Sequence, residues 1–345
     1  MKAFKWKACL ALFIEGADRM VLKIGFIGSG GIARYHMERL AKMPDVQIAA
    51  TCDVVEERAK EAANLYRAKA YTDFHEMLDR EDLGAVWVAI PPFAHTDEVS
   101  YAAKKGVHVF IEKPIALTME KAREMQRDTE KAKIKTWVGY HWRQSQAIRR
   151  AKALLEQEGG PIGMVAGYFW SGIPGGPDHW WRRKELSGGQ VIEQSTHIFD
   201  LCRFLVGEVD RVYAEFATLL NADKPNFTVE DVSVVTLRFR NGAIGFVTST
   251  SGAKPKGGFA GLRLLARNLQ LNADGTAVVH VFKDKESMDL VSENDPYFDE
   301  NRKSVDAIAK DLPTEVPISE GVKSLELSVA AVKSAESGRV IKLPL

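Results

Sequence analysis

Residues 21–36 run from a short apolar stretch through a glycine cluster into an amphipathic segment. This pattern predicts a strand, a tight turn and the start of a helix. Gly28, Gly30 and Ala33 give the spacing G-x-G-x-x-A. The first glycine allows the turn, the second lets a pyrophosphate approach the backbone, and Ala33 lets the helix pack closely on the strand. The segment therefore predicts a dinucleotide site at a helix N-terminus, where free N–H groups attract phosphates.

A second apolar run, residues 46–52, ends in Asp53, which follows Ala33 by about 20 residues, the spacing expected for a ribose ligand. An acidic side chain at this strand end accepts hydrogen bonds from the adenosine ribose and repels a 2'-phosphate. No arginine follows it directly, since Val54 and Val55 come next. We therefore predict NAD rather than NADP. The alternative is that Asp53 only caps the following helix, but the nearby glycine turn favours cofactor binding.

Strands and helices alternate through the first 140 residues. Such alternation predicts an α/β fold with a doubly wound parallel sheet, whose ligand lies across the carboxyl ends of the strands. Those ends are expected at Gly28, Asp53, Pro91 and Glu112. The further strands are predicted at 70–72, 85–90 and 107–111, and the helices at 30–42, 54–66, 74–78 and 95–105.

Beyond residue 142 the pattern changes to a helix at 146–156 and then a series of strand-like segments. Asn241-Gly242 and Asp274-Gly275 predict hairpin turns. We expect an α+β second domain with a large, mostly antiparallel open sheet. The predicted domains are 20–142 and 143–345, with 1–19 as an extension outside the fold. The strands are expected at 162–171, 209–219, 229–240, 243–252, 262–272 and 277–283.

Composition narrows the function classes. The chain is 46% hydrophobic and 27% charged with a net charge of +1, so it is globular and lacks a field that would attract nucleic acid or an anionic membrane. Its three cysteines, Cys9, Cys52 and Cys202, are far apart and odd in number. This argues against a disulfide framework or a structural zinc site and favours the cytoplasm. A small molecule is the expected partner.

Lys113 follows the predicted strand 107–111 and precedes Pro114, which stiffens the turn. At the mouth of a parallel sheet it would stand beside the predicted nicotinamide position. Burial there would lower the pKa of the lysine, so that its amine could bind a substrate hydroxyl and exchange a proton with it. The alternative is a surface ion pair with Glu112, but a lysine at this strand end favours catalysis.

Glu193 and His197 are spaced to share one helix face, and Asp200 extends the stripe. His197 could move the alcohol proton near neutral pH, while Glu193 orients the imidazole or contacts a sugar hydroxyl. The alternative is a helix whose polar face meets only water. We predict no metal site, because these three residues lack a fourth ligand with matching spacing.

The loop 171–183 is too rich in Gly and Pro to be helical and carries Trp180 and Trp181. The two indoles could stack on the C–H face of a sugar ring or cover the nicotinamide. Equally, either tryptophan could be buried at the junction between the two domains and have only a structural role. A nucleic-acid platform is disfavoured, because this is one short patch on a nearly neutral chain.

These motifs together resemble the Gfo/Idh/MocA family of oxidoreductases over nearly the whole chain after Met20. Residues 28–33, Cys52-Asp53, Ile90-Pro91-Pro92 with His95, Glu112-Lys113-Pro114 and residues 187–200 occur in the family's order. The resemblance implies an N-terminal Rossmann domain and a homodimer or homotetramer through the C-terminal sheet. It also implies two sets of ligand-binding residues. The cofactor would meet Gly28, Gly30, Gly31, Ile32, Ala33, Asp53, Ile90, Pro91, His95, Glu112 and Lys113, and the substrate would meet Lys113, Tyr140, Trp180, Trp181, Glu193 and His197.

Two positions depart from the family pattern. Glu193 stands where the family usually has aspartate, so its longer side chain would meet a different substrate hydroxyl. Pro92 replaces an asparagine found in many relatives.

Three functions remain open. The first is an NAD-dependent dehydrogenase of a sugar, inositol or other polyol, with Lys113, His197 and Glu193 as catalytic residues. The second is a redox-neutral enzyme that keeps NAD bound, forms a ketone transiently, and cleaves or epimerises a glycoside. The third, disfavoured by the presence of both Lys113 and His197, is a sensor of NAD or sugar without catalysis.

Overall fold

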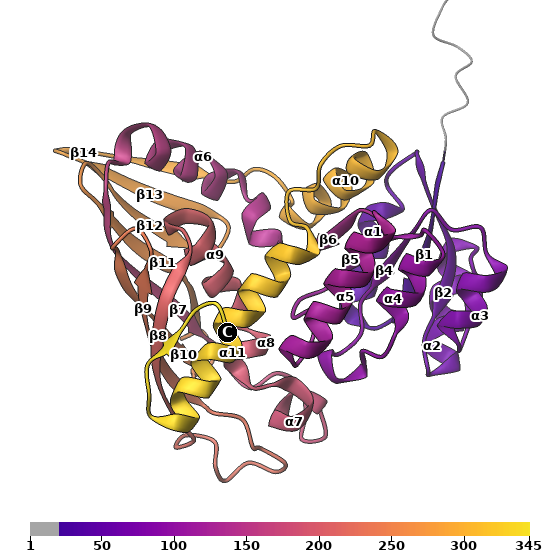
Figure 1. The fold of residues 1–345 in the computed structure, drawn as a ribbon, viewed down its shortest axis with the longest axis horizontal. Coiled ribbons are helices and arrows are strands. Elements are labelled where there is room, and N and C mark those ends of the chain that lie inside the picture. The colour runs from indigo at the N-terminus through magenta and orange to yellow at the C-terminus, as the bar shows by residue number, and fades with distance from the viewer. Residues whose placement is uncertain (1–20) are drawn as a thin grey trace, which may run out of the picture.

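The computed structural model describes residues 21–345, which fold around two sheets (Figure 1). The prediction for residues 1–19 lies outside the described residues. The predicted fold class is confirmed, with a parallel six-stranded sheet joined to a mostly antiparallel nine-stranded one. Among residues 21–345, no helix is long and apolar enough to cross a membrane.

The parallel sheet has the strand order β3-β2-β1-β4-β5-β6. Its central strand β4 is a continuous apolar run, and all four of its residues are buried because helices cover both faces. The strands are β1 (Leu22–Ile27), β2 (Val46–Cys52), β3 (Lys69–Tyr71), β4 (Ala85–Val88), β5 (His108–Ile111) and β6 (Thr136–Val138). The helices are α1 (Gly31–Leu40), α2 (Glu56–Tyr66), α3 (Phe74–Arg80), α4 (Glu98–Lys104) and α5 (Met119–Ala132).

The larger sheet has the order β14-β13-β12-β11-β7-β10-β9-β8-β15, and of its neighbouring pairs only β7 and β10 run parallel. Its strands are β7 (Ile162–Trp170), β8 (Val209–Ala217), β9 (Val232–Phe239), β10 (Ile244–Thr250), β11 (Phe259–Ala266), β12 (Gln270–Asp274), β13 (Val278–Lys283), β14 (Glu286–Val291) and β15 (Ile341–Lys342). The accompanying helices are α6 (Gln146–Leu154), α7 (Lys184–Ser187), α8 (Gln190–Glu193), α9 (Thr196–Val206), α10 (Pro296–Ala309) and α11 (Ile318–Ser337).

The prediction of one strand at 262–272 is wrong. The chain reverses within it, where the Ala266 N–H donates to the Leu269 carbonyl at 2.9 Å, and β11 pairs antiparallel with β12. The turn contains no glycine or proline, but the buried apolar positions shift there from Leu262 and Leu264 to Leu269 and Leu271, a break in the alternation that the prediction overlooked.

Helix α11 runs between the two sheets, and α10 lies beside α1 (Figure 1). The apolar core around the parallel sheet accordingly includes Val305 of α10 and Val322 and Leu325 of α11. Segments from the end of the chain thus pack against the elements of the parallel sheet. The division at residues 142 and 143 stays a prediction.

Candidate active site

The glycine turn after β1 leaves room for a phosphate group. Gly28 has φ +95°, and a Cβ there would lie 2.3 Å from the Ala89 carbonyl oxygen, so only glycine fits. A Cβ on Gly30 or Gly31 would meet nothing within 4 Å. Gly30 caps α1 with extended backbone, so the free N–H groups of the first turn face this open space. The cradle therefore fits a dinucleotide pyrophosphate.

Asp53 is tied to the same turn. Its Oδ2 accepts the Ser29 N–H at 2.9 Å, and its Oδ1 accepts the Val55 N–H at 2.9 Å. The carboxylate thus holds the glycine turn against the end of β2, a structural role that the sequence did not reveal. Each carboxylate oxygen keeps a lone pair for a ribose hydroxyl.

The other predicted cofactor residues line the neighbouring strand ends. Ile90 and Pro91 follow β4, and the turn after them leads to His95. The His95 ring is buried and its Nδ1 lies 2.6 Å from Glu98 Oε1. Ile32 lies in the first turn of α1 and is partly exposed, whereas Ala33 is fully buried beneath it.

Lys113 and Glu193 join the two halves of the site. Lys113 Nζ lies 2.9 Å from Glu193 Oε1 and donates at the same distance to the Glu193 carbonyl. Glu193 Oε2 accepts the indole N–H of Trp181 at 2.8 Å. The side chains of Lys113 and Glu193 are 16% and 15% exposed. Glu112 does not share this ion pair, since its carboxylate bonds to His36 instead.

His197 lies close to this pair. Its ring is buried, and Nδ1 has no hydrogen-bond partner among residues 21–345. Burial lowers the pKa of His197 well below its ordinary value, and the charge of Lys113 and the neighbouring His141 lower that pKa further. The imidazole is therefore neutral at pH 7.

The prediction that Glu193 and His197 share one helix is wrong. Helix α8 ends at Glu193 and α9 begins at Thr196, because the Ser195 N–H turns back to the Gln190 carbonyl at 2.9 Å. Asp200 does not extend the stripe into the site. It forms a buried bidentate pair with Arg143, with both N···O distances 2.7 Å.

The aromatic residues divide into buried and partly exposed groups. Trp181 is 1% exposed and packs with Phe227 and Val229, so its contact with the site is the indole N–H. Trp180 is partly buried, with its ring centroid 6.1 Å from that of Phe93. Tyr140 is fully buried, and its hydroxyl hydrogen-bonds Thr196 Oγ1 at 2.8 Å.

Two residues of the site were missed in the sequence. His141 lies edge-on to His197 with centroids 4.9 Å apart and stacks on Tyr297 at 3.9 Å. Burial, followed by the charge of Lys113, lowers the pKa of His141 to about 3. The position of His141, beside Tyr140 after β6, could have suggested it. Tyr297 comes from α10, more than 150 positions later, and no local signal marks it.

Comparison with known proteins agrees with this geometry. Residues 22–140 match the family model described as "Oxidoreductase family, NAD-binding Rossmann fold", and residues 148–267 match "GFO/IDH/MocA C-terminal domain". The myo-inositol 2-dehydrogenase of Thermotoga maritima is 29% identical, with 93% of this chain and 98% of that protein aligned. D-xylose 1-dehydrogenase (NADP(+)) 2 of Haloferax volcanii is 25% identical, with 93% and 100% aligned.

Solved structures share the fold. Levoglucosan dehydrogenase in complex with NADH and levoglucosan superposes with a TM-score of 0.87 at 22% identity, over 94% of this chain and 100% of that one. A probable dehydrogenase from Thermotoga maritima gives a TM-score of 0.80 at 28% identity, over 93% and 99%. With both domain models matched in order, the chain belongs to the Gfo/Idh/MocA family of NAD-binding oxidoreductases.

Proposed function

We propose that the protein is an NAD(H)-dependent dehydrogenase that acts on a carbinol carbon of a sugar, inositol or related polyol. The observation that carries this proposal is the Lys113–Glu193 ion pair beside the neutral His197. The relatives named as dehydrogenases of inositol, xylose and levoglucosan support the substrate class.

Bound NAD⁺ would accept the hydride from the carbinol carbon. In our proposal Lys113, held by Glu193 Oε1, binds the substrate oxygen and stabilises its negative charge as the hydride leaves. His197 is neutral, so its ring can accept the hydroxyl proton. Burial makes the imidazole a weak base, but the hydroxyl becomes strongly acidic as its carbon loses hydride.

Glu193 acts as a positioning residue for Lys113 in this proposal. Both of its carboxylate oxygens already accept hydrogen bonds, one from Lys113 and one from Trp181. Its remaining lone pairs are left for a substrate hydroxyl. Trp181 therefore supports the site through its N–H, whereas Trp180, partly exposed near Phe93, is the better candidate for stacking on a sugar ring.

The test is NADH absorbance while purified protein is supplied with NAD⁺ and a panel of sugars, inositols, uronates and glycosides. Net NADH formation with a polyol supports the proposal. Cleavage or epimerisation with NAD retained and no net NADH would favour the redox-neutral alternative. Binding of NAD or sugar without either reaction would favour the sensor.

We also propose a homodimer or homotetramer through the larger sheet. One of its faces carries cross-strand apolar neighbours, with Met164 between Ile244 and Leu265 and Trp170 beside Phe259. All but Phe259 are more than a third exposed. An apolar face of this kind favours a second copy as its cover. Light scattering of wild type and of Trp170→Glu tests this, and a monomeric wild type contradicts it.

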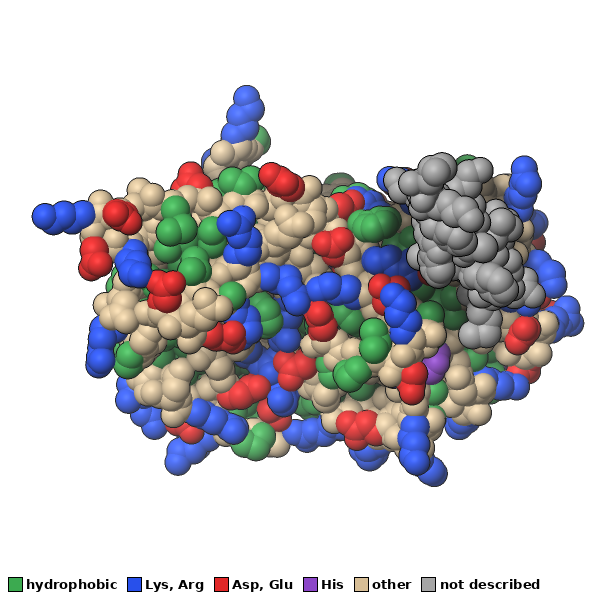
Figure 2. Space-filling model, turned by 90° about the horizontal axis from the view of Figure 1, so that it is seen from above, with side chains coloured by type: hydrophobic (Ala, Val, Ile, Leu, Met, Phe, Trp, Pro, Cys, Tyr) green, Lys and Arg blue, Asp and Glu red, His purple; other side chains and the backbone are tan. Residues whose placement is uncertain are grey.

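For partners and location, we propose a small-molecule substrate, no nucleic acid or membrane partner, and a cytoplasmic protein. Acidic and basic side chains are interspersed over the face seen in Figure 2, which suits a chain with a net charge of +1. Cys52 and Cys202 are buried and free, in keeping with a reducing compartment.

A further inference from the structure

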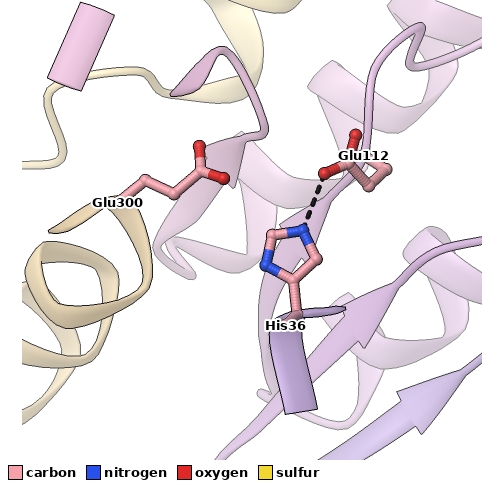
Figure 3. A group of neighbouring side chains, drawn as sticks. All are labelled: His36, Glu112 and Glu300. Atoms are coloured by element: carbon pink, nitrogen blue, oxygen red, sulfur yellow. Dashed lines mark hydrogen bonds and ion pairs between the residues drawn. The ribbon is translucent and has the colours of Figure 1, made fainter. Parts of the chain in front are cut away.

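A buried polar cluster lies directly behind the Lys113 turn. His36 of α1, Glu112 after β5 and Glu300 of α10 point toward one another (Figure 3). One side-chain atom of each lies within 4.8 Å of the others, and none of the three residues is more than 7% exposed. The cluster brings two carboxylates into the protein interior. Its total charge therefore has to be balanced.

Hydrogen-bond partners surround two members of the cluster. The Trp87 indole N–H donates to Asn301 Oδ1 at 2.8 Å, and His36 Nδ1 lies 2.9 Å from Asn301 Nδ2 and 3.1 Å from Asn301 Oδ1. His36 Nε2 lies 2.7 Å from Glu112 Oε1. Glu112 Oε2 accepts the Lys113 backbone N–H at 3.1 Å. Each Glu112 oxygen therefore has a nitrogen partner, as a buried carboxylate requires.

Glu300 has no such partners. It is fully buried, and neither of its carboxylate oxygens has a hydrogen-bond partner among residues 21–345. The charged groups around it are Glu112, Asp295 and Arg39, with His36 and Tyr297 beside them, and two of these three charges are negative. Arg39 is itself paired with Asp295 at 2.8 Å. A second anion here would face Glu112 with nothing to balance it.

We propose that Glu300 is a neutral carboxylic acid in the folded protein and that this proton lets α10 pack against the anionic Glu112, which positions Lys113. Burial and the nearby Glu112 and Asp295 raise the pKa of Glu300 well above its ordinary value. The Glu112 carboxylate in turn fixes the Lys113 turn through the backbone N–H. Glu300 is thus a positioning residue, which acts on Lys113 through Glu112.

Infrared spectroscopy of the whole protein at about pH 8 tests the protonation directly, because an ordinary glutamic acid is ionised there. We expect the C=O band of a protonated carboxyl group in wild type and in Glu320→Gln, and its loss in Glu300→Gln. Glu320 is a matched control, because the charges of Arg203 and Arg143 lower the pKa of that carboxyl to about 2 despite its burial. If Glu300→Gln fails to fold, Glu112→Gln serves instead. The band should then disappear at a lower pH than in wild type, because the neighbouring negative charge is gone.

Thermal unfolding gives a second readout with a definite sign. A raised pKa in the folded state means that stability falls as pH rises from about 4.5, the ordinary value, toward the folded value. Glu300→Gln removes this loss, so its Tm relative to wild type should increase with pH. The Tm of Glu320→Gln relative to wild type should fall between pH 2 and about 4.5 and stay constant above that range. We also expect kcat of wild type to decline at high pH and Glu300→Gln to lose that decline.

Only the kcat readout rests on the proposed dehydrogenase function, so the infrared and Tm results stand if that function is wrong. The proposal is overturned if wild type lacks the carboxyl band, or if the Tm difference for Glu300→Gln falls with pH. It is also overturned if purified protein holds an equimolar divalent metal that Glu300→Gln loses, because a cation would then balance the cluster.

Discussion

Lys113 and Glu193 meet across the junction between the two sheets, with Nζ and Oε1 2.9 Å apart. Lys113 follows β5 of the parallel sheet, and Glu193 ends α8 in the second half of the chain. The ion pair is mostly removed from solvent, so it is screened less than a surface pair. Because one partner comes from each half, the proposed reaction depends on how the halves pack.

Glu193→Gln should keep the indole hydrogen bond but lose the charge that holds Lys113. We expect KM for the substrate to rise roughly 10- to 100-fold, the range for a lost hydrogen bond to a charged group, with a smaller change in kcat. Glu193→Asp keeps the charge on a shorter side chain and should shift preference among substrates. Steady-state kinetics with two polyols measures both variants, and unchanged KM in Glu193→Gln would contradict the positioning role.

Asp53→Ser should weaken NAD binding and reduce discrimination against NADP. The variant loses the negative charge against the 2'-phosphate and also the two hydrogen bonds that hold the glycine turn. We expect the NAD to NADP affinity ratio to fall by roughly 10- to 100-fold. Titration with each cofactor measures the ratio. Tighter NADP binding by wild type would mean that Asp53 does not face the ribose.

Asp200→Asn should destabilise the fold without acting on substrate. It leaves the buried Arg143 guanidinium short of a counter-charge, a loss that costs about 3–5 kcal/mol. Chemical unfolding measures the free energy. The matched double variant Arg143→Met/Asp200→Leu removes both charges and should recover much of the loss. A stable Asp200→Asn would show that Glu320, 3.1 Å from Arg143, compensates alone.

Acid should destabilise the protein through His141. Its pKa is about 3 when folded and near 6.5 when unfolded, so the unfolded chain binds a proton that the folded chain does not. Stability should therefore fall as pH drops from about 6.5 toward 3. His141→Asn should reduce this slope, measured as Tm against pH. Equal slopes in wild type and His141→Asn would contradict a neutral, buried His141.

Local patterns predicted the parts of the site that lie next to strand ends. The glycine turn, Asp53 and Lys113 each follow an apolar run directly, and in a parallel sheet the ends of such runs meet at one edge. His141 and Tyr297 could not be paired in this way, because α10 reaches the first domain only through tertiary packing. Glu300 could not be predicted for the same reason, because its neighbours Glu112 and His36 lie on other elements and meet it only in the folded chain.

Spacing alone also misplaced two features. The separation of Glu193 and His197 suits one helix, but the turn at Ser195 divides it. Glu193 still pairs with Lys113, and His197 lies close enough for the Lys113 charge to lower its pKa. The strand predicted at 262–272 hid a turn built without glycine. Backbone hydrogen bonds define both breaks, and at the second the buried apolar positions also shift, from Leu264 to Leu269.

The most direct test of the account is NADH formation by Lys113→Met with a substrate that wild type oxidises. Methionine keeps the length of the side chain but removes its charge and its proton. We predict that NAD affinity stays within a few-fold while turnover falls by roughly two to four orders of magnitude, the range for a lost acid–base group. His197→Ala removes the proposed proton acceptor and should lower turnover as well. Near-full turnover by Lys113→Met would contradict the assignment of this site to hydride transfer.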